Sequence, residues 1–438
     1  MSYQRTRRAT LRTIAAGAIG ASTLVTAASA SEGDGGDLVW DFETGGAVYS
    51  SPTVIDGTVY VGSADNNVYA LEEEDGTELW SDNTALTVEA SPVVVEETVF
   101  ACGAADWDGN GILFALEAPN GQPVWDKEID ARSNASPAVA NGIAYFGDWS
   151  GTLHALDAES GDEEWTFETD DVEFGSSGIH GALTVADETL YVPSRNGTLY
   201  ALEADSGEER WSFEADDEFT AGATVADGLV YIGNEDSHLY ALDADSGDEE
   251  WSIETNISMS STPTVADGTV FFGTRPDVRA VDADTGADSW EVETEGSIRG
   301  APTVVDDTVF VGADSSVLAL DTATGEEHWS FETDDLINSA PTVADGTVYF
   351  GSGGVNERDT TVYAVDAGVE GYSEDSRVDL GTYGHHEEWA YADHTLAGDP
   401  EEEDDDSDGM PGFGAGAGAV GIGAAGYLWH RTAGSSGD

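Results

Sequence analysis

The chain repeats one alternation of apolar and polar residues. In residues 241–244, Ala-Leu-Asp-Ala places every second side chain on the same side of an extended strand. Asp-Ser-Gly follows as a turn in which the glycine can take a positive φ, and Trp251 then opens a second extended run. This pattern predicts a β-hairpin with one buried face.

The motif from Ala241 to Trp251 occurs seven times, always with the same spacing from alanine to glycine to tryptophan. Its copies start at Ala70, Ala115, Ala155, Ala201, Ala241, Ala280 and Ala319. A tryptophan side chain buries roughly 150–250 Å², so we interpret the tryptophan as a wedge that docks one repeat onto the next. The expected docking residues are Trp40, Trp80, Trp125, Trp165, Trp211, Trp251, Trp290 and Trp329.

These tryptophans recur about every 40 residues, which is typical of a β-propeller. Each unit contains four short strand-like segments, named A, B, C and D here in chain order. Eight A–B–C modules begin at Ser51, Ser91, Ser136, Ala182, Ala223, Thr262, Ala301 and Ala340. We therefore predict an all-β, eight-bladed propeller of four-stranded antiparallel blades over residues 38–368.

Two segments compete to close the ring. The D-like strand at residues 38–44 has no A–C module before it, and the last module, residues 339–366, has no D strand directly after it. Pairing these two joins the N-terminus to the C-terminal blade and removes both open edges. The alternative is the strand around Trp389, within a C-terminal extension at 369–398 that is otherwise expected to add an extra outer strand.

The motif Ala-Leu-Asp-Ala-x-Thr/Ser-Gly-x-x-x-Trp resembles the tryptophan-docking motif of PQQ-like β-propeller repeats. Such repeats occur in quinoprotein dehydrogenases and in BamB-like scaffold proteins. The resemblance covers roughly residues 38–366 and implies the fold. It leaves the function open, because the motif residues hold blades together and contact no cofactor.

The charge of the chain is strongly one-sided. It has 88 acidic residues against 14 Lys and Arg, a formal net charge of −74, and Lys127 is its only lysine. An acid excess of this kind keeps a protein hydrated and is associated with halophiles. It also argues against nucleic acid as a partner, because phosphate binding needs clustered Lys and Arg. We expect a protein from an extreme halophile.

Both ends of the chain read as sorting signals. Residues 1–30 contain no acid and carry Arg7-Arg8 and Ala28-Ser29-Ala30, which predict a Tat export signal followed by a linker at 31–37. An acidic linker at 399–410 is expected to be disordered. Residues 411–438 begin Pro-Gly-Phe and resemble the PGF-CTERM signal of haloarchaea, although Thr432–Asp438 extend past its basic end. The resemblance implies lipid attachment, and hence a cell-surface protein that contacts the membrane only through that anchor. We also expect a monomer.

One face of the predicted ring is elaborated. The insertions at 103–111, 174–180 and 351–360 fall in B–C or D–A connections, which share a face, and insertions of this kind usually mark a binding side. Arginines on this face suggest an anionic or carboxylate-bearing ligand, although they can instead pair with local acids. The candidate partner-face residues are Arg132, Arg195, Arg275, Arg299, Arg358, Trp107, Trp149 and His180. Glycosylation sequons at Asn134, Asn196 and Asn256 lie on the same face.

One segment fits a calcium loop. Acids at its first and third positions, a Gly at the sixth and a Glu at the twelfth match the pattern that binds Ca²⁺. The candidate ligands are Asp106, Asp108, Asn110, Ile112 and Glu117. Against calcium, Glu117 is also the acid of the repeated motif, and no flanking helices are expected.

Nothing in the sequence assigns a catalytic or cofactor-binding residue. Cys102 is the single cysteine, so it cannot form an internal disulfide, and its apolar strand predicts a buried side chain. The quinoprotein dehydrogenases that the repeat resembles have an adjacent cysteine pair and a calcium–Asp site, from which this chain departs, so PQQ is not expected. No P-loop, nucleophile elbow or dinucleotide fingerprint occurs, and the histidines lack metal-binding spacing.

The sequence leaves two candidate functions open. The first is a non-enzymatic cell-surface binding or scaffold protein that holds a protein or envelope ligand, and a structural envelope component is a variant of it. The alternative is a PQQ-dependent oxidoreductase. The sequence does not name the ligand.

Overall fold

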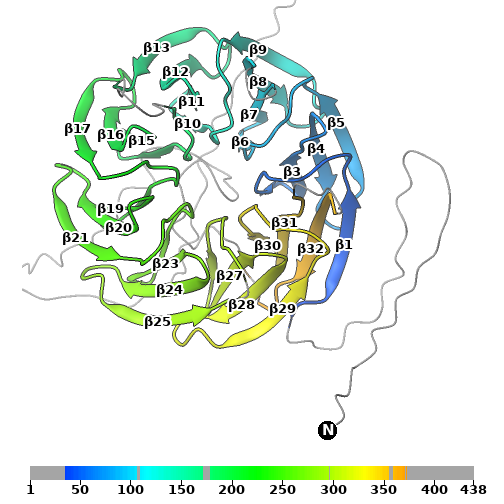
Figure 1. The fold of residues 1–438 in the computed structure, drawn as a ribbon. Coiled ribbons are helices and arrows are strands. Elements are labelled where there is room, and N and C mark those ends of the chain that lie inside the picture. Colours follow the sequence, from blue (N-terminus) through cyan, green and yellow to red (C-terminus); the bar gives the residue numbers. More distant parts are fainter. Residues whose placement is uncertain are drawn as a thin grey trace, which may run out of the picture. The chain divides into compact units, whose positions relative to one another are not determined.

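The computed structural model describes residues 35–105, 109–170, 178–294, 296–354, 359–369 and 371. Every regular element in these ranges is a β-strand, and the strands form eight four-stranded antiparallel sheets that follow one another around a ring (Figure 1). The predicted all-β, eight-bladed propeller is therefore confirmed. Within the same ranges, no helix has the length and apolarity that a membrane crossing requires.

The blades are numbered by the order of their A strands. Blade 1 contains β2 Thr53–Ile55, β3 Thr58–Gly62, β4 Asn67–Glu72 and β5 Glu78–Asn83, and blade 2 contains β6 Val93–Val95, β7 Thr98–Ala104, β8 Gly111–Glu117 and β9 Pro123–Ile129. Blade 3 contains β10 Ala138–Ala140, β11 Ile143–Gly147, β12 Thr152–Asp157 and β13 Glu163–Glu168, and blade 4 contains β14 Thr184–Ala186, β15 Thr189–Pro193, β16 Thr198–Glu203 and β17 Glu209–Glu214.

Blades 5 to 8 repeat the arrangement, except that the last takes its outer strand from the other end of the chain. Blade 5 contains β18 Thr224–Ala226, β19 Leu229–Asn234, β20 His238–Asp243 and β21 Glu249–Glu254, and blade 6 contains β22 Thr264–Ala266, β23 Thr269–Gly273, β24 Asp277–Asp282 and β25 Asp288–Glu293. Blade 7 contains β26 Thr303–Val305, β27 Thr308–Ala313, β28 Ser316–Asp321 and β29 Glu327–Glu332, and blade 8 contains β30 Thr342–Ala344, β31 Thr347–Gly351, β32 Thr361–Asp366 and β1 Leu38–Glu43.

Short turn residues set the register of each blade. Ile55 pairs directly with Thr58, which leaves Asp56 and Gly57 as a two-residue loop with φ of 50° and 75°. Positive φ at both positions defines a type I′ turn, whose twist matches that of the flanking strands. In the C–D turn of blade 5, Asp243 Oδ1 accepts hydrogen bonds from the backbone N–H and hydroxyl of Ser246, and Gly247 takes a φ of 73°. The repeated Asp-Gly and Asp-x-x-Gly spacings thus encode the hairpins.

The hydrophobic core lies between the blades. Each of the eight larger apolar clusters combines side chains of two neighbouring blades, and together they run around the whole ring. The B strands are buried on both sides of the pleat, as expected for a sheet covered on both faces. Every blade therefore depends on both neighbours for its burial.

The A strands line the centre and are tied together by threonines. Thr53 Oγ1 donates a 2.5 Å hydrogen bond to the carbonyl oxygen of Pro92 in the next blade, and Thr224 donates to Pro263 at 2.6 Å. Across the seam between the last and first blades, Thr342 donates to Pro52 at 2.7 Å. The threonine hydroxyls thus donate hydrogen bonds to buried proline carbonyl oxygens that lie outside the β-strand pairing.

Indoles lock the outer seams. Trp125 Nε1 donates a 2.9 Å hydrogen bond to the carbonyl oxygen of Ala158, one blade further on. A Cβ added to Gly161 of that same turn would lie 2.7 Å from the Trp125 ring, so only glycine permits this stacking. Equivalent bonds of 2.8–3.1 Å are made by Trp40, Trp80, Trp211, Trp251, Trp290 and Trp329. Trp165 occupies the same place, yet its buried Nε1 has no acceptor among the described residues.

The ring closes through the N-terminal strand. β1 pairs antiparallel with β32, so that Trp40 lies opposite Ala364 and Phe42 opposite Val362 (Figure 1). Trp40 then docks onto blade 1 by donating a hydrogen bond to Glu73. The competing strand around Trp389 lies outside the described residues.

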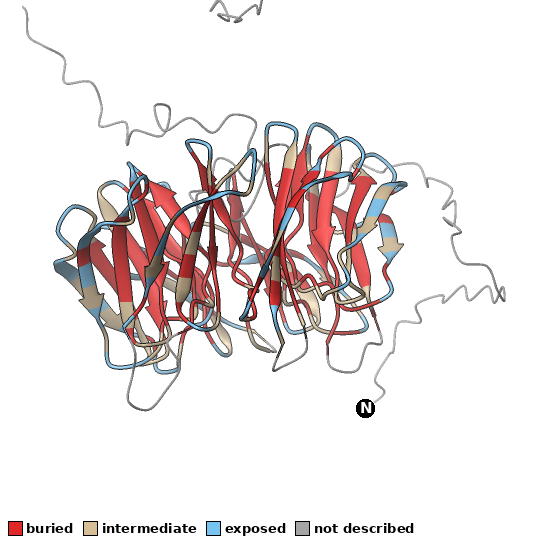
Figure 2. Cartoon of the chain, turned by 90° about the horizontal axis from the view of Figure 1, so that it is seen from above, coloured by how far each residue is buried: buried red, intermediate tan, exposed pale blue. Residues whose placement is uncertain are grey.

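The connections emerge on two faces. B–C and D–A connections form one face, here called the loop face, and A–B and C–D turns form the other, the turn face. In the side view, the buried middle of the strands separates two exposed rims (Figure 2). The long connections between β7 and β8, between β13 and β14, and between β31 and β32 all belong to the loop face.

Candidate functional site

A polar cavity occupies the centre of the loop face. All eight D–A loops contribute to its wall, and its volume is ≈ 130 Å³. Its wall carries hydroxyls and amides together with one carboxylate, one imidazole and one guanidinium. Representative residues, one from each loop, are Ser51, Glu89, Asn134, His180, Thr220, Ser260, Arg299 and Asn338. A cavity of this composition suits a small polar or charged group.

Five side chains from three neighbouring blades form a network beside this cavity. Arg132 lies over the Trp149 ring at 4.5 Å, and its Nη2 is 3.3 Å from Glu89 Oε2. Trp149 Nε1 donates a 2.6 Å hydrogen bond to Asn134 Oδ1, and Asn134 Nδ2 donates to Glu89. The His180 ring stacks on Trp149 with 4.3 Å between centroids. The network fixes the D–A loops of blades 2, 3 and 4 relative to one another.

His180 is held in its neutral form. Burial lowers its pKa to about 3, and the positive charges of Arg195 and Arg132 act in the same direction. Its Nε2 is buried and has no hydrogen-bond partner in the part of the chain that the structure describes. A neutral imidazole on the cavity wall can donate or accept a hydrogen bond according to its tautomer.

The structure divides the candidate arginines of the loop face into two groups. Arg132 pairs with Glu89, and Arg195 Nε donates a 2.5 Å hydrogen bond to Glu218 Oε2. Arg275 and Arg299 are exposed, and neither forms an ion pair with a residue in the described ranges. Arg358 and Trp107 lie outside those ranges. Pairing with local acids therefore accounts for Arg132 and Arg195, and among the described residues it does not account for Arg275 and Arg299.

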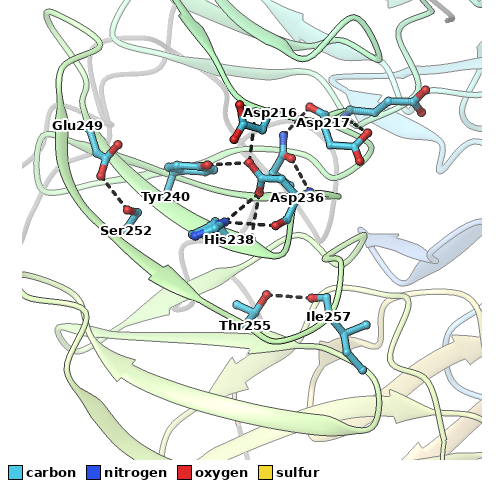
Figure 3. Close-up of polar contacts among 11 residues, drawn as sticks. Asp216, Asp217, Asp236, His238, Tyr240, Glu249, Ser252, Thr255 and Ile257 are labelled. Atoms are coloured by element: carbon cyan, nitrogen blue, oxygen red, sulfur yellow. Dashed lines mark hydrogen bonds and ion pairs between the residues drawn. The ribbon is translucent and has the colours of Figure 1, made fainter.

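Two acids on this face, Asp236 and Asp148, stabilise the turns in which they lie. In the B–C turn of blade 5, Asp236 accepts hydrogen bonds from the Tyr240 hydroxyl at 2.7 Å, the His238 backbone N–H at 3.1 Å and the Asp216 backbone N–H at 3.4 Å (Figure 3). In blade 3, burial raises the pKa of Asp148, but hydrogen bonds from His154, Ser150 and Thr152 outweigh it and hold that pKa below its usual value. These carboxylates are structural acceptors.

The predicted calcium loop stays a prediction, and the structure places its last candidate ligand, Glu117, at the far end of a strand from Asn110. Residues Gly111–Glu117 form one continuous strand, β8, so Asn110 stands at the loop face and Glu117 at the turn face. Strands rise about 3.3 Å per residue, which places Glu117 about 20 Å beyond the start of β8. Glu117 instead accepts a 2.7 Å hydrogen bond from Asn120 in the C–D turn, and Ile112 pairs with Gly103. Asp106 and Asp108 lie outside the described residues, and no metal-binding cluster occurs within them.

The single cysteine is a core residue. Cys102 is fully buried in blade 2, where its Sγ lies 3.4 Å from the Ala135 carbonyl oxygen. Burial raises its pKa to about 12, which removes the thiolate at neutral pH. The side chain is therefore unreactive in the folded protein.

The three sequons differ in accessibility. Asn134 Nδ2 is bound to Glu89 at the cavity wall, and Asn196 Nδ2 donates to the Tyr200 hydroxyl at 2.7 Å. Asn256 is exposed at a φ of 63° in the D–A loop that follows β21. Of the three, the Asn256 amide is the one presented to solvent.

Sequence reasoning missed the roles of Glu89 and Asn134. Both lie in D–A loops at the fourth position before the A strand, where other blades carry different residues such as Tyr49, Ser260 and Arg299. Their contacts join positions 45 residues apart. No pattern in the chain signals this pairing.

The eight blades, docked onto one another by indoles around a ring, define a β-propeller of PQQ-like repeats. The chain matches the family described as outer membrane protein assembly factor BamB over residues 10–137, 109–216, 150–277 and 274–371. The chain belongs to this family.

Individual relatives are more distant. BamB of Moranella endobia (strain PCIT) is 29% identical over 145 residues, which are 30% of this chain and 37% of the relative. The crystal structure of BamB from Moraxella catarrhalis has a TM-score of 0.64 at 19% identity and covers 75% of this chain and 99% of that one. Quinohemoprotein alcohol dehydrogenase from Comamonas testosteroni has a TM-score of 0.64 at 17% identity, over 77% of each chain. Likenesses at these identities show a shared fold.

Proposed function

We propose that this protein is a non-enzymatic binding or scaffold protein of the cell envelope, which holds a protein or envelope ligand on the loop face of its propeller. One observation carries the proposal. The three longest insertions and the central cavity all occur on one face, while the turn face keeps tight turns. Elaboration of one face of a repeat ring is typical of a binding surface.

Membership of the BamB family supports a binding role over catalysis. The relatives' name describes an assembly factor of the outer membrane. For this chain we propose the coarser role, envelope binding, with an unidentified partner. Export by the Tat route and anchoring through the C-terminal segment belong to the same proposal and rest on the sequence alone.

The residues present do not fit a large planar cofactor such as PQQ. The cavity of ≈ 130 Å³ is smaller than the roughly 300–1,000 Å³ of typical ligand pockets, and no tryptophan among the described residues lines it. Cys102, buried within blade 2, cannot join a disulfide beside the cavity. These features favour the scaffold over the oxidoreductase.

One pair of measurements separates the two functions. The purified full chain is mixed with PQQ and assayed for dye-linked alcohol oxidation, and in parallel it is used to capture partners from an envelope extract of the source cells. The scaffold predicts saturable capture and no quinone-dependent oxidation. Turnover with PQQ, with no protein or envelope ligand retained, would overturn it.

A further inference from the structure

The chain carries three Asn-x-Ser/Thr sequons, which are acceptor sequences for N-linked glycosylation. Asn134 lies in the D–A loop before β10, Asn196 in the B–C turn after β15, and Asn256 in the D–A loop after β21. All three connections belong to the loop face. A glycan is attached to the side-chain Nδ2, so the surroundings of each amide decide which sequon a modifying enzyme can reach.

Two of the three amides are held by other side chains of the loop face. Asn134 Nδ2 donates a 3.3 Å hydrogen bond to Glu89 Oε2. Asn196 Nδ2 donates to the Tyr200 hydroxyl at 2.7 Å, and Asn196 Oδ1 accepts a 2.9 Å bond from the Thr198 backbone N–H. Both asparagines are half-buried. A sugar attached to either Nδ2 would break these contacts and displace the packed loops around it.

Asn256 is exposed at the apex of a loop that is anchored on both sides. Thr255 N donates a 2.8 Å hydrogen bond to Ser237 O, and Met259 N donates to Asn234 O at 3.1 Å. In the part of the chain that the structure describes, the Asn256 side chain forms no hydrogen bond. The loop therefore presents this amide to solvent on a fixed backbone.

The backbone conformation does not by itself explain an asparagine at this position. Asn256 has a φ of 63°, in the left-handed region that asparagine tolerates better than most residues. Ala85, at the equivalent position of the D–A loop after β5, nevertheless has a φ of 65°. In both loops the preceding threonine donates a 2.8 Å hydrogen bond from Oγ1 to the carbonyl oxygen of the following residue, as Figure 3 shows for Thr255 and Ile257. Alanine therefore suffices for this turn, and the asparagine amide is free for another role.

An exposed hydrophobic side chain lies next to this amide in the chain. Ile257 is 41% exposed. The other large hydrophobic side chains exposed to this degree in the described ranges lie at the start of D strands, close to the turn face: Leu38, Val39, Leu79 and Val124. On the described loop face, Ile257 thus stands alone, and a sugar on the neighbouring residue would cover it with C–H groups.

We propose that Asn256 is the N-glycosylated residue of this protein. Its Nδ2 attacks the anomeric carbon of a sugar carried on a lipid phosphate. The new C–N bond replaces the C–O bond to the phosphate, the lipid phosphate leaves, and a base of the transferase takes the Nδ2 proton. Ser258 supplies the hydroxyl of the sequon. The inference relies on the export proposed above, because twin-arginine export delivers a folded chain in which the transferase meets only exposed amides.

A glycan at this position leaves the central cavity open. Asn256 comes two residues after the outer strand β21, whereas Ser260 lines the cavity. The D–A loop runs inward between these two residues, so the sugar stands at the outer edge of the loop face. It therefore limits which partners can approach that edge without filling the cavity.

The test is mass spectrometry of peptides from the full chain, purified from the envelope fraction of the source cells. The wild type and Ser258→Thr, which keeps the sequon, should carry a sugar adduct on the peptide that contains Asn256. Ser258→Ala leaves Asn256 in place and should lose the adduct completely, as should Asn256→Ala, which copies the turn at Ala85. The matched controls Asn134→Gln and Asn196→Gln should keep it.

Three results overturn the inference: an unmodified Asn256 in the wild type, a sugar on Asn134 or Asn196 in its place, or an adduct at Asn256 that survives Ser258→Ala. The cell fraction separates this failure from that of the proposed function. Unmodified protein that reaches the envelope and still captures its partner refutes the glycan alone. Unmodified protein confined to the cytoplasm refutes the proposed export as well.

Discussion

Trp40 Nε1 donates a 2.8 Å hydrogen bond to the carbonyl oxygen of Glu73, although Trp40 belongs to the last blade and Glu73 to the first. The bond joins the strand that completes the ring to the blade that follows it. At the preceding seam, Trp329 packs against Gly35 and Gly36 and donates to Ala367 at 3.1 Å. The N-terminal segment therefore contributes to both seams of blade 8.

Deleting residues 35–43 should lower stability far more than truncating the chain after residue 371. The deletion exposes the edge of β32 and removes the burial of Trp40, so we expect a loss on the order of 5 kcal/mol and a fall in Tm of about 7 °C. The truncation removes the competing strand around Trp389 and should leave Tm within about 2 °C. Thermal unfolding followed by circular dichroism measures both. The reverse order would assign closure to the C-terminal strand.

Replacing Trp125 by Phe should destabilise the protein more than replacing Trp165 by Phe. Both changes trade an indole for a phenyl ring, but only Trp125 donates a hydrogen bond across its seam. Trp125→Phe removes this hydrogen bond and leaves the Ala158 carbonyl oxygen without its donor. It should therefore lower the free energy of unfolding by about 1 kcal/mol more than Trp165→Phe does. Denaturant titration of the two variants gives the difference. Equal losses would show that the indole N–H contributes nothing to docking.

Gly76→Ala should be more destabilising than Gly57→Ala. Both glycines have a positive φ, 70° and 75°, so a Cβ strains the backbone in each case by about 1–2 kcal/mol. At Gly76 the Cβ would also lie 2.6 Å from the Trp40 ring, whereas nothing lies within 4 Å at Gly57. We expect a further 1–3 kcal/mol at Gly76, about the cost of overpacking. Similar effects at both positions would argue against close stacking of the indole.

His180 should remain neutral from pH 7 down to about pH 4, because its pKa is lowered to about 3. The imidazole of the unfolded chain gains its proton near pH 6.5. Protonation therefore favours unfolding, and this effect grows as the pH falls from about 6.5 towards 3. Wild type should lose more stability between pH 7 and pH 4 than His180→Gln, by about 1–3 kcal/mol. NMR titration of the His180 ring checks the premise, and a midpoint near 6.5 would contradict it.

The fold could be predicted from the sequence because its determinants repeat. The Asp-Gly and Asp-x-x-Gly turns fix hairpin registers, and the spacing of tryptophans such as Trp125 and Trp251 counts the blades. The unmatched strand around Trp40 indicated the closure. Each of these signals is local, so neighbouring residues alone reveal it.

The sequence indicates which face of the ring carries the candidate site, but not which side chains meet there. Spacing alone suggested a calcium loop, but β8 runs through it and carries Glu117 to the turn face. Likewise, sequence could not tell that Arg132 meets Glu89 while Arg299 meets no described acid. Those outcomes depend on D–A loops that carry different residues at equivalent positions and approach one another only in the ring.

Blocking one face at a time tests the central claim most directly. Cys102 is buried with a raised pKa, so a single exposed cysteine can be introduced and labelled with a large maleimide polymer. Ser260→Cys places the label on the loop face and Ser206→Cys on the turn face, and both serines are exposed. The account predicts that the label at position 260 abolishes capture of the envelope partner and that the label at 206 leaves capture intact. Capture that survives at 260 and fails at 206 would contradict it.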